Sequence, residues 1–224
     1  QADMYASNIE QNELQSSFDI YFRGDKLGRI TLNCPGAYNI YNALASVAVA
    51  CELDIDFEAI ESGLKLFRGV ERRFEVRGTV NNIMVVDDYG HHPVEIKAVL
   101  KAAREGFKRR AVVVFQPHRY SRTEDLMEEF LSAFNDAEKL ILTDIYAAGE
   151  KPIEGVTGES LYEQIKGHGH KDVTYIPEFK NLAAHVKSVV KPGDMVITLG
   201  AGNVWEVGVE LVERLVKEEK KVVE

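Results

Sequence analysis

The sequence predicts an α/β fold with an open parallel sheet, and three features support this prediction. After residue 72, five short runs rich in β-branched residues alternate with stretches of helical periodicity. The runs are apolar along their whole length, which is typical of strands buried on both faces of a parallel sheet. Polar, charged and glycine residues follow the runs directly, at the ends of the strands where ligands bind in such sheets.

The predicted strands and the helices that follow them occupy most of residues 73–224. In chain order, the pairs are 82–86 with 93–105, 111–115 with 122–135, 139–143 with 158–167, 173–176 with 178–190, and 195–199 with 203–217. A segment of roughly 150 residues falls within the usual size of one domain. We therefore predict a single α/β domain over residues 73–224.

Residues 1–72 have a different pattern. Between Ser17 and Leu32, apolar and polar residues alternate on both sides of Gly24-Asp25, which predicts an antiparallel hairpin. Two amphipathic helices follow, and Asp56 is the predicted N-cap of the second. Their apolar faces consist of Ile40, Leu44, Val47, Ala48 and Cys51 in the first helix and Ile60, Leu64 and Phe67 in the second. A hairpin and two helices bury little surface, so we expect this segment to be part of a larger domain.

Composition argues against several classes of function. The 224 residues carry a formal net charge of -9, and an excess of acidic residues does not suit binding to a nucleic-acid backbone. The two cysteines, Cys34 and Cys51, form no CxxC pair, so we expect neither a disulfide framework nor a thiolate zinc site. The chain has no run of about 18 apolar residues and no signal-peptide pattern. We predict a cytoplasmic protein with no membrane partner.

The residues after the apolar runs are the candidates for chemistry. DDYGHHP (87–93) follows the first run, QPHRYSR (116–122) the second, Asp144 the third and GAGN (200–203) the fifth. Because the carboxyl ends of parallel strands meet at one edge of the sheet, these loops predict a shared ligand site.

Two of these loops suggest anion binding. Arg119 and Arg122 lie at the start of a predicted helix, where guanidinium groups and outward N–H groups bind carboxylate or phosphate. The alternative is a solvated helix start with surface ion pairs. GAGN allows a backbone to approach an anion closely, but Trp205 replaces the third glycine of the dinucleotide motif, so we do not favour dinucleotide binding.

The histidines form no metal motif. His91 and His92 are adjacent and lack a third ligand at a suitable spacing, so we favour hydrogen bonds to a substrate or to neighbouring carboxylates over a zinc site. His168 and His170 are expected in a surface loop. The chain also contains no GxxxxGK[ST] phosphate loop, so a protein that uses ATP would grip the triphosphate outside this chain.

Six stretches of the chain, in this order, resemble the Mur ligases. They are PGAYNIYNALASVAVACEL (35–53), FRGVERRFEVRG (67–78), VVDDYGHHPVEIKAVLKAAR (85–104), VVFQPHRYSRT (113–123), LTDIYAAGEKPIEGVTG (142–158) and ITLGAGNVW (197–205). The pairing of DDYGHHP with QPHRYSR resembles in particular the members that add L-alanine to UDP-N-acetylmuramate. Members of the family have three domains. By this resemblance, residues 1–72 would be the last part of the central ATP-binding domain, and residues 73–224 the C-terminal Rossmann-like ligase domain.

The resemblance implies a ligase of peptidoglycan synthesis that uses ATP and Mg²⁺. In this reaction ATP phosphorylates the lactyl carboxylate of UDP-N-acetylmuramate, and the amine of L-alanine attacks the acyl phosphate. Without a phosphate loop, the chain alone is expected to be inactive. Two alternatives stay open: a sister ligase that attaches a recycled peptide to the same sugar nucleotide, and a non-catalytic module that binds a nucleotide or an amino acid.

The resemblance also implies roles for individual residues, and none of them is expected to bind a metal. On the ATP side, the expected residues are Tyr38, Asn39, Arg73 and Asp88, where Asn39 contacts adenine and Tyr38 replaces a histidine that is usual in the family. On the substrate side they are Tyr89, His91, His118, Arg119 and Arg122, of which His118, Arg119 and Arg122 are expected to be catalytic.

Overall fold

A computed structural model describes residues 2–223 of the chain. The chain divides into two compact units, one of residues 1–70 with 101–108 and the other of residues 71–100 with 109–224. The predicted domain boundary after residue 72 lies next to the first of these divisions. No helix among the described residues is long and apolar enough to cross a membrane.

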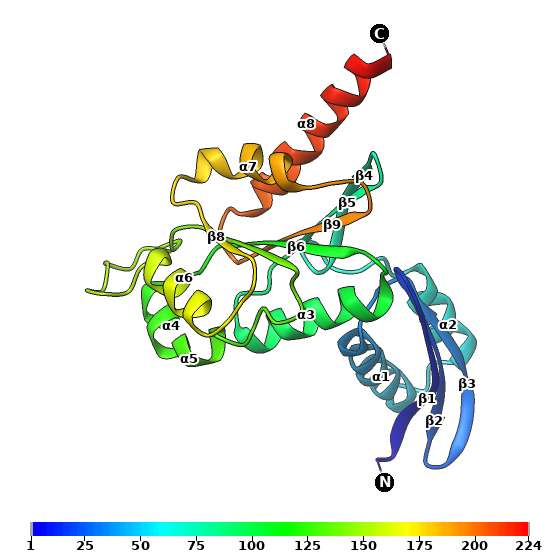
Figure 1. The fold of residues 1–224 in the computed structure, drawn as a ribbon. Helices are drawn as coiled ribbons and strands as arrows, with labels where there is room; N and C mark the ends of the chain where they lie inside the picture. The colour runs from blue at the N-terminus through cyan, green and yellow to red at the C-terminus, as the bar shows by residue number, and fades with distance from the viewer. Residues whose placement is uncertain (1, 224) are drawn as a thin grey trace. The chain divides into compact units, whose positions relative to one another are not determined.

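The first unit contains an antiparallel sheet in the order β1-β2-β3 and two helices (Figure 1). The elements are β1 (Met4–Asn12), β2 (Gln15–Phe22), β3 (Asp25–Leu32), α1 (Ala37–Glu52) and α2 (Phe57–Leu66). The predicted hairpin corresponds to β2 and β3, whereas β1 was not predicted. Its register shifts between Ser7 and Glu10, and this bulge breaks the alternation by which a strand is recognised.

The core of the first unit lies between the sheet and the helices. The buried residues are Phe18, Ile20, Ile30 and Leu32 from the strands and Ile40, Ala43, Val47 and Ile60 from the helices. Asp56 precedes α2 as predicted, but its side chain makes no capping hydrogen bond. The prediction that Phe67 lies on the buried face of α2 is wrong, because the helix ends at Leu66 and Phe67 is extended and 42% exposed.

The second unit is built on a sheet of six strands in the order β4-β5-β9-β6-β7-β8. The strands are β4 (Glu75–Val80), β5 (Ile83–Asp88), β6 (Arg110–Phe115), β7 (Lys139–Leu142), β8 (Val173–Tyr175) and β9 (Asp194–Leu199). Strands β5 to β9 are parallel, which confirms the predicted α/β class, and β4 is an antiparallel edge strand. β4 was not predicted because an edge strand is only half buried and its residues, EVRGTV, include charges and a glycine.

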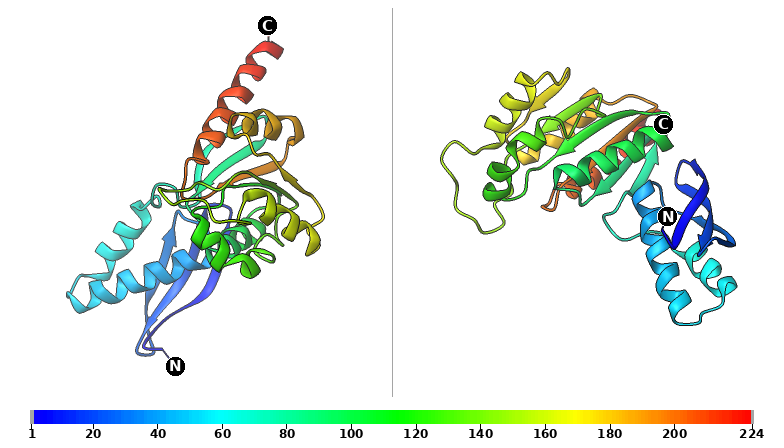
Figure 2. Two further views of the ribbon diagram at one scale, coloured as in Figure 1. Left: turned by 90° about the vertical axis from the view of Figure 1, so that its left-hand side faces the viewer. Right: turned by 90° about the horizontal axis from the view of Figure 1, so that it is seen from below.

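Helices cover both faces of this sheet (Figures 1 and 2). They are α3 (Pro93–Gly106), α4 (Tyr120–Asp125), α5 (Met127–Phe130), α6 (Gly158–Gly167), α7 (Leu182–Val189, after the 3-10 turn η1, Phe179–Asn181) and α8 (Trp205–Val223). α7 and α8 pack on one face with Val85, Val112 and Val196, and α3 and α6 lie on the other. The single helix predicted over 122–135 is wrong, because the chain turns at Leu126 (φ -113°, ψ 19°) and forms the short helices α4 and α5.

The register of the central strands brings the predicted site loops together. Leu199 at the end of β9 lies opposite Asp88 of β5 on one side and Phe115 of β6 on the other. Gly200 N donates to Asp88 O at 3.2 Å, and Gln116 N donates to Leu199 O at 3.0 Å. The loops after β5 and β6 therefore start level with each other, on either side of the GAGN loop.

Candidate functional site

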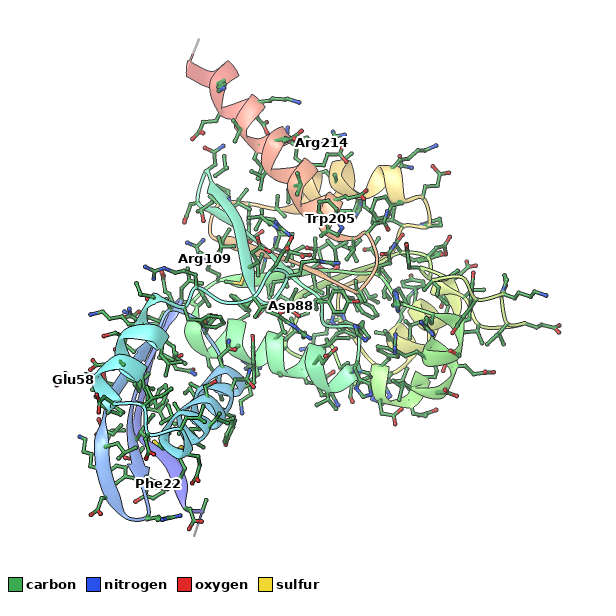
Figure 3. All side chains as sticks on the ribbon, turned by 180° about the vertical axis from the view of Figure 1, so that it is seen from behind. Phe22, Glu58, Asp88, Arg109, Trp205 and Arg214 are labelled. Carbon is green, nitrogen blue, oxygen red and sulfur yellow. The ribbon has the colours of Figure 1, made fainter. Side chains whose placement is uncertain are left out.

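Asp88 is a buried carboxylate at the end of β5 (Figure 3). It is 1% exposed, and its two oxygens accept hydrogen bonds from Phe74 N at 2.8 Å and Gly90 N at 2.7 Å. Burial raises the pKa of Asp88 to about 6, although these N–H groups and the charge of Arg73 act in the opposite direction. The carboxylate of Asp88 thus holds two backbone segments in place.

Arg72, which sequence reasoning missed, connects loops at the carboxyl ends of the strands. We refer to this end of the sheet as the rim. Its Nε donates to Asp87 Oδ2 at 2.9 Å, and its Nη2 donates to Gly200 O at 2.6 Å. Asp87 is fully buried and also accepts a hydrogen bond of 2.6 Å from Thr198 Oγ1. The neighbouring Arg73, which was predicted on the ATP side, is 44% exposed and pairs with Glu95 at 3.5 Å. Of the two arginines Arg72 and Arg73, only Arg73 has a guanidinium that is accessible to a ligand.

The loop of Tyr89 and His91 is held at the start of α3. Glu95 accepts hydrogen bonds from the backbone N–H groups of His91 and His92, at 3.1 Å and 3.2 Å. The Nδ1 atom of His91 lies 3.0 Å from Tyr89 O and 3.8 Å from Glu95 Oε2. These contacts fix the ring of His91 at the carboxyl edge of the sheet, edge-on to the ring of Tyr89 with 5.4 Å between centroids.

His118 lies in the loop after β6, and its ring is held from two sides. Arg122 Nη1 lies 3.0 Å from His118 Nδ1 and donates to His118 O at 3.1 Å. Tyr146 stacks on the other side, with ring centroids 5.6 Å apart and an interplanar angle of 10°. Burial, with the positive charge of Arg122 as the next cause, lowers the pKa of His118 to about 4. His118 is therefore neutral at physiological pH.

Four rings form a row along this edge of the sheet. His91 and His118 lie side by side with centroids 5.7 Å apart, and Tyr89 and Tyr146 stand at the two ends of the row. The structure thus brings together four of the predicted substrate-side residues, namely Tyr89, His91, His118 and Arg122. We refer to Tyr89, His91, His118 and Tyr146 as the ring row.

Arg119 lies beside the ring row in a backbone conformation unusual for its type, with a φ of 74°. Its N–H donates to Tyr146 O at 2.9 Å, and its carbonyl accepts from Thr123 Oγ1 at 2.8 Å. The side chain is 49% exposed and lies 3.7 Å from Glu150 Oε1. Its guanidinium is therefore only loosely paired.

Glu150 occupies the helix start at which the sequence predicted the binding of an anion. Its carboxylate accepts hydrogen bonds from Ser121 N at 3.1 Å and Ser121 Oγ at 2.7 Å, so a carboxylate of this chain already occupies the start of α4. These hydrogen bonds lower the pKa of Glu150. Tyr146 and Glu150 both lie in the stretch IYAAGE after β7. Their position after an apolar run was the one signal that could have identified them.

The GAGN loop packs against protein atoms. A Cβ placed on Gly202 would lie 2.3 Å from Gln116 Oε1 and 2.7 Å from the ring of Tyr146, so no side chain fits there. Gln116 Nε2 donates to Asn203 Oδ1 at 3.1 Å. The glycines of this loop thus serve the close packing of the rim. Asp144, at the end of β7, accepts a hydrogen bond from the hydroxyl of Tyr175.

Tyr38 and Asn39 belong to the first unit, in the first turn of α1. Asn39 Nδ2 donates to Pro35 O at 2.8 Å. A Cβ on Gly36 would lie 2.7 Å from the ring of Tyr38, so the ring packs on the glycine that precedes the helix.

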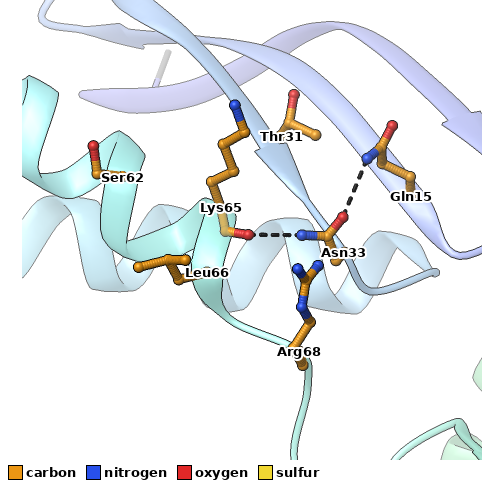
Figure 4. Close-up of a pocket in the computed structure, with 7 residues that line it drawn as sticks. All are labelled: Gln15, Thr31, Asn33, Ser62, Lys65, Leu66 and Arg68. Atoms are coloured by element: carbon orange, nitrogen blue, oxygen red, sulfur yellow. Dashed lines mark hydrogen bonds between the residues drawn. The ribbon is translucent and has the colours of Figure 1, made fainter.

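The first unit also has a pocket of about 430 Å³ (Figure 4). It is lined by Gln15, Thr31, Asn33, Ser62, Lys65, Leu66 and Arg68. The side-chain amide of Asn33 accepts a hydrogen bond from Gln15 Nε2 at 3.1 Å and donates one to Lys65 O at 2.7 Å. Both ends of this amide are therefore already bonded within the protein.

Among the described residues, the remaining histidines and carboxylates are not grouped as metal ligands. Within residues 2–223, no three His, Cys, Asp or Glu side chains gather as they would around a metal ion. His168 is exposed as predicted. His170 is not a plain surface residue, because it is half-buried and burial lowers its pKa.

The chain is similar to known Mur ligases. The family described as "Mur ligase, glutamate ligase domain" matches residues 72–202. The UDP-N-acetylmuramate–L-alanine ligase of Geotalea uraniireducens is 59% identical over 215 residues, which cover 96% of this chain and 47% of that protein. The enzyme of the same name from Geotalea daltonii is 58% identical over the same lengths. The chain thus spans about half the length of the curated relatives it matches.

Solved structures show the same fold. The UDP-N-acetylmuramate–alanine ligase MurC of Thermotoga maritima is 26% identical and has a TM-score of 0.81, covering 97% of this chain and 47% of that one. A MurF ligase of the same organism, solved in complex with ADP, is 17% identical with a TM-score of 0.71 and covers 98% of this chain and 48% of that one. At this lower identity the second likeness concerns the fold alone.

Proposed function

Because this chain belongs to the Mur ligase family, we propose that the protein containing it joins L-alanine to the lactyl carboxylate of UDP-N-acetylmuramate, using ATP, in peptidoglycan synthesis. The identity of 59% to a ligase of that name is the observation that carries the proposal. The rim of imidazole and guanidinium groups supports it, since the reaction handles several anionic groups. ATP and UDP-sugars as substrates make the cytoplasm the expected location.

The proposed reaction has two steps. The γ-phosphoryl group of ATP is transferred to the lactyl carboxylate, which turns a poor leaving group into phosphate. The amine of L-alanine then attacks the acyl carbon, and inorganic phosphate departs. Negative charge develops on oxygen in both steps, so fixed cations and N–H donors stabilise the transition states.

Arg119 and Arg122 are the cations that we assign to this role. The guanidinium of Arg119 is 49% exposed and loosely paired, so it can turn to a ligand at little cost. Arg122 lies against His118 and keeps donors beyond the two hydrogen bonds it makes through Nη1. Guanidinium forks bind carboxylate or phosphoryl oxygens in a bidentate manner, which suits the alanine carboxylate or the acyl phosphate.

His118 acts as a hydrogen-bond donor in this proposal. A guanidinium only donates, so His118 Nδ1 accepts from Arg122 and the single proton of the neutral ring sits on Nε2. A pKa of about 4 makes His118 a weak base. The Nε2–H group is suited to an oxygen of the substrate.

Each unit has residues that we assign to ATP. Asn39 uses its amide N–H₂ on Pro35 O, so its Oδ1 is the atom that can accept a hydrogen bond from the amino group of adenine. Arg73 has an exposed charge for phosphate or ribose oxygens, and Asp88 acts through the backbone of Phe74 and Gly90. The described residues offer no set of ligands for Mg²⁺, so we assign none of them to the metal.

The test is phosphate release by the whole protein that contains this chain, with ATP, Mg²⁺, UDP-N-acetylmuramate and L-alanine. Arg122→Ala should lower the rate by roughly 10²-fold or more, whereas the matched control Arg214→Ala, at an exposed pair on α8, should not change it. Release that does not depend on the sugar nucleotide would contradict the proposal and favour a nucleotide-binding module. Activity with a peptide but not with L-alanine would favour the sister ligase.

A further inference from the structure

We propose that His91 is the proton acceptor for the attacking amine, and that its neighbour His118 is confined to donating a hydrogen bond. The inference rests on the ligase function proposed above and adds an assignment of roles within the ring row. It follows from hydrogen bonds that fix each imidazole in a different neutral form.

The hydrogen bond of His91 fixes where its proton lies. Its Nδ1 is 3.0 Å from Tyr89 O, and a carbonyl oxygen can only accept a hydrogen bond. Nδ1 therefore carries the hydrogen, and Nε2 of the neutral ring carries the lone pair. No hydrogen bond within residues 2–223 engages this Nε2, and it is not among the buried polar atoms that lack a partner. A basic nitrogen is thus open to a ligand.

His118 has the opposite arrangement. Its Nδ1 accepts from the guanidinium of Arg122, so its lone pair is engaged and its proton sits on Nε2. To act as a base through Nδ1, His118 would have to lose this contact. The low pKa of the ring, which burial and Arg122 cause, works in the same direction.

The two rings are close enough to act on one substrate. Their centroids are 5.7 Å apart, on loops that leave β5 and β6 on the two sides of β9. A reacting centre within reach of both Nε2 atoms would meet an acceptor on His91 and a donor on His118. An attack that removes a proton from nitrogen while charge grows on oxygen needs this combination.

Charged and polar groups face the ring of His91 from several elements. Glu95 Oε2 lies 3.8 Å from Nδ1, so a carboxylate stands beside the Nδ1 atom of the ring and not beside the open Nε2. Opposing it, Arg73 pairs with Glu95, and Arg122 lies behind His118. Tyr89 and His118 complete the titratable surroundings of the ring. A carboxylate behind an imidazole stabilises the imidazolium that forms when the ring takes a proton.

The step balances as follows. The lone pair of the amine forms the new C–N bond at the acyl carbon, and the C–O bond to the phosphoryl group breaks, with its electron pair leaving on inorganic phosphate. One proton passes from the nitrogen of the amine to Nε2 of His91. The imidazolium then returns that proton to solvent, which restores the neutral ring.

The experiment compares two nucleophiles in the whole protein that contains this chain. At neutral pH the ammonium group of L-alanine has to lose a proton before its nitrogen can attack. Hydroxylamine is mostly unprotonated at this pH, and it traps the acyl phosphate as a hydroxamate without needing a strong base. The variants are His91→Asn, whose amide can keep the hydrogen bond to Tyr89 O, and His118→Asn. His92→Asn is the matched control, since His92 contacts only the start of α3 among the described hydrogen bonds.

We expect His91→Asn to lower the rate with L-alanine by about 10²- to 10³-fold and the rate with hydroxylamine by less than about tenfold. His118→Asn should lower both rates by a similar factor, and His92→Asn should lower neither. Equal losses for His91→Asn with both nucleophiles would overturn the inference, because a structural role does not distinguish between them. If the unaltered protein forms no hydroxamate, the acyl phosphate of the proposed function fails, and this inference fails with it.

A second measurement does not depend on activity or on a variant. Nitrogen-15 NMR of the whole protein that contains this chain reports which ring nitrogen of each neutral histidine carries the proton. We expect Nδ1–H for His91 and Nε2–H for His118. The reverse assignment for His91 would overturn the inference even if the variant lost activity.

Discussion

The amino and carboxyl ends of the strands in the six-stranded sheet, here called its amino and carboxyl edges, differ in how accessible their charged side chains are. At the amino edge, where the strands begin, Arg110 makes two hydrogen bonds to Asp194, at 3.0 Å and 2.6 Å, and Asp194 is 1% exposed. At the carboxyl edge, Arg73 and Arg119 lie 3.5 Å and 3.7 Å from their partners and are 44% and 49% exposed. One edge uses its guanidinium groups within the protein, and the other keeps them accessible.

This difference separates charged groups that stabilise the fold from charged groups that are accessible to a ligand. A buried carboxylate that loses its partner is left uncompensated, whereas an exposed ion pair contributes little and is easily given up to a ligand. Arg72 is the exception at the carboxyl edge, because it is bonded to buried Asp87 and to Gly200 O. It holds in place the loops on which the accessible groups stand.

The largest effect is expected at the amino edge. Arg110→Ala should lower the free energy of unfolding of the second unit by about 3 kcal/mol or more, since it leaves Asp194 buried without its cation. Lys139→Ala is the matched control, because its partner Asp172 is 46% exposed, and it should cost less than about 1 kcal/mol. The chain has 1 tryptophan, Trp205, which lies in the second unit, so urea unfolding followed by its fluorescence reports on this unit. Equal losses would remove the distinction between the pairs.

An intermediate effect is expected from Asp88, as a function of pH. Its pKa of about 6 lies above the ordinary aspartate pKa of 3.8, so the folded protein binds this proton more tightly than the unfolded chain does. The resulting stability is fully present below about pH 4 and is lost as the pH rises through about 6. Relative to Asp88→Asn, the protein should therefore lose about 3 kcal/mol as the pH rises from well below 4 to well above 6, of which about 2 kcal/mol is lost between pH 4 and 6. Paired urea titrations across this range measure it, and a constant difference would contradict the raised pKa.

The smallest effect on stability is expected from Arg119. Arg119→Ala removes only a loose, exposed ion pair, so the free energy of unfolding should change by less than about 1 kcal/mol. Phosphate release should nevertheless fall by roughly 10²-fold if the guanidinium binds the substrate. Unfolding and activity measured on the same preparation decide the matter. A large loss of stability would mean that the two edges are less different than their geometry indicates.

The sequence predicted the sheet better than its borders. The strands β5, β6, β7 and β9 each contain a run of at least three consecutive apolar residues with polar residues beside it, and these runs were sufficient to predict them. The edge strands β1 and β4 were missed, because a strand exposed on one side, or interrupted by a bulge, lacks a continuous pattern. The helix over 122–135 was overestimated, because no strong breaker marks the turn at Leu126.

The sequence predicted which loops form the candidate site but not which of their residues contact one another. Strand ends identified the loops of His91, His118 and Arg119, since these loops follow apolar runs in the chain. No pattern in the sequence could show that Glu150 binds Ser121, or that Tyr146 stacks on His118, because these partners lie far apart along the chain. The opposite proton positions on the two imidazoles likewise depend on contacts that only coordinates provide.

The left-handed backbone of Arg119 has a consequence for how this position can evolve. A glycine would adopt its φ of 74° with less strain, by roughly 1 kcal/mol, but would lose the guanidinium. Selection for thermal stability alone would then favour glycine at this position, whereas selection for the proposed ligase activity would retain arginine. In deep mutational scanning under these two selections, we expect position 119 to be one at which growth and melting temperature favour different residues.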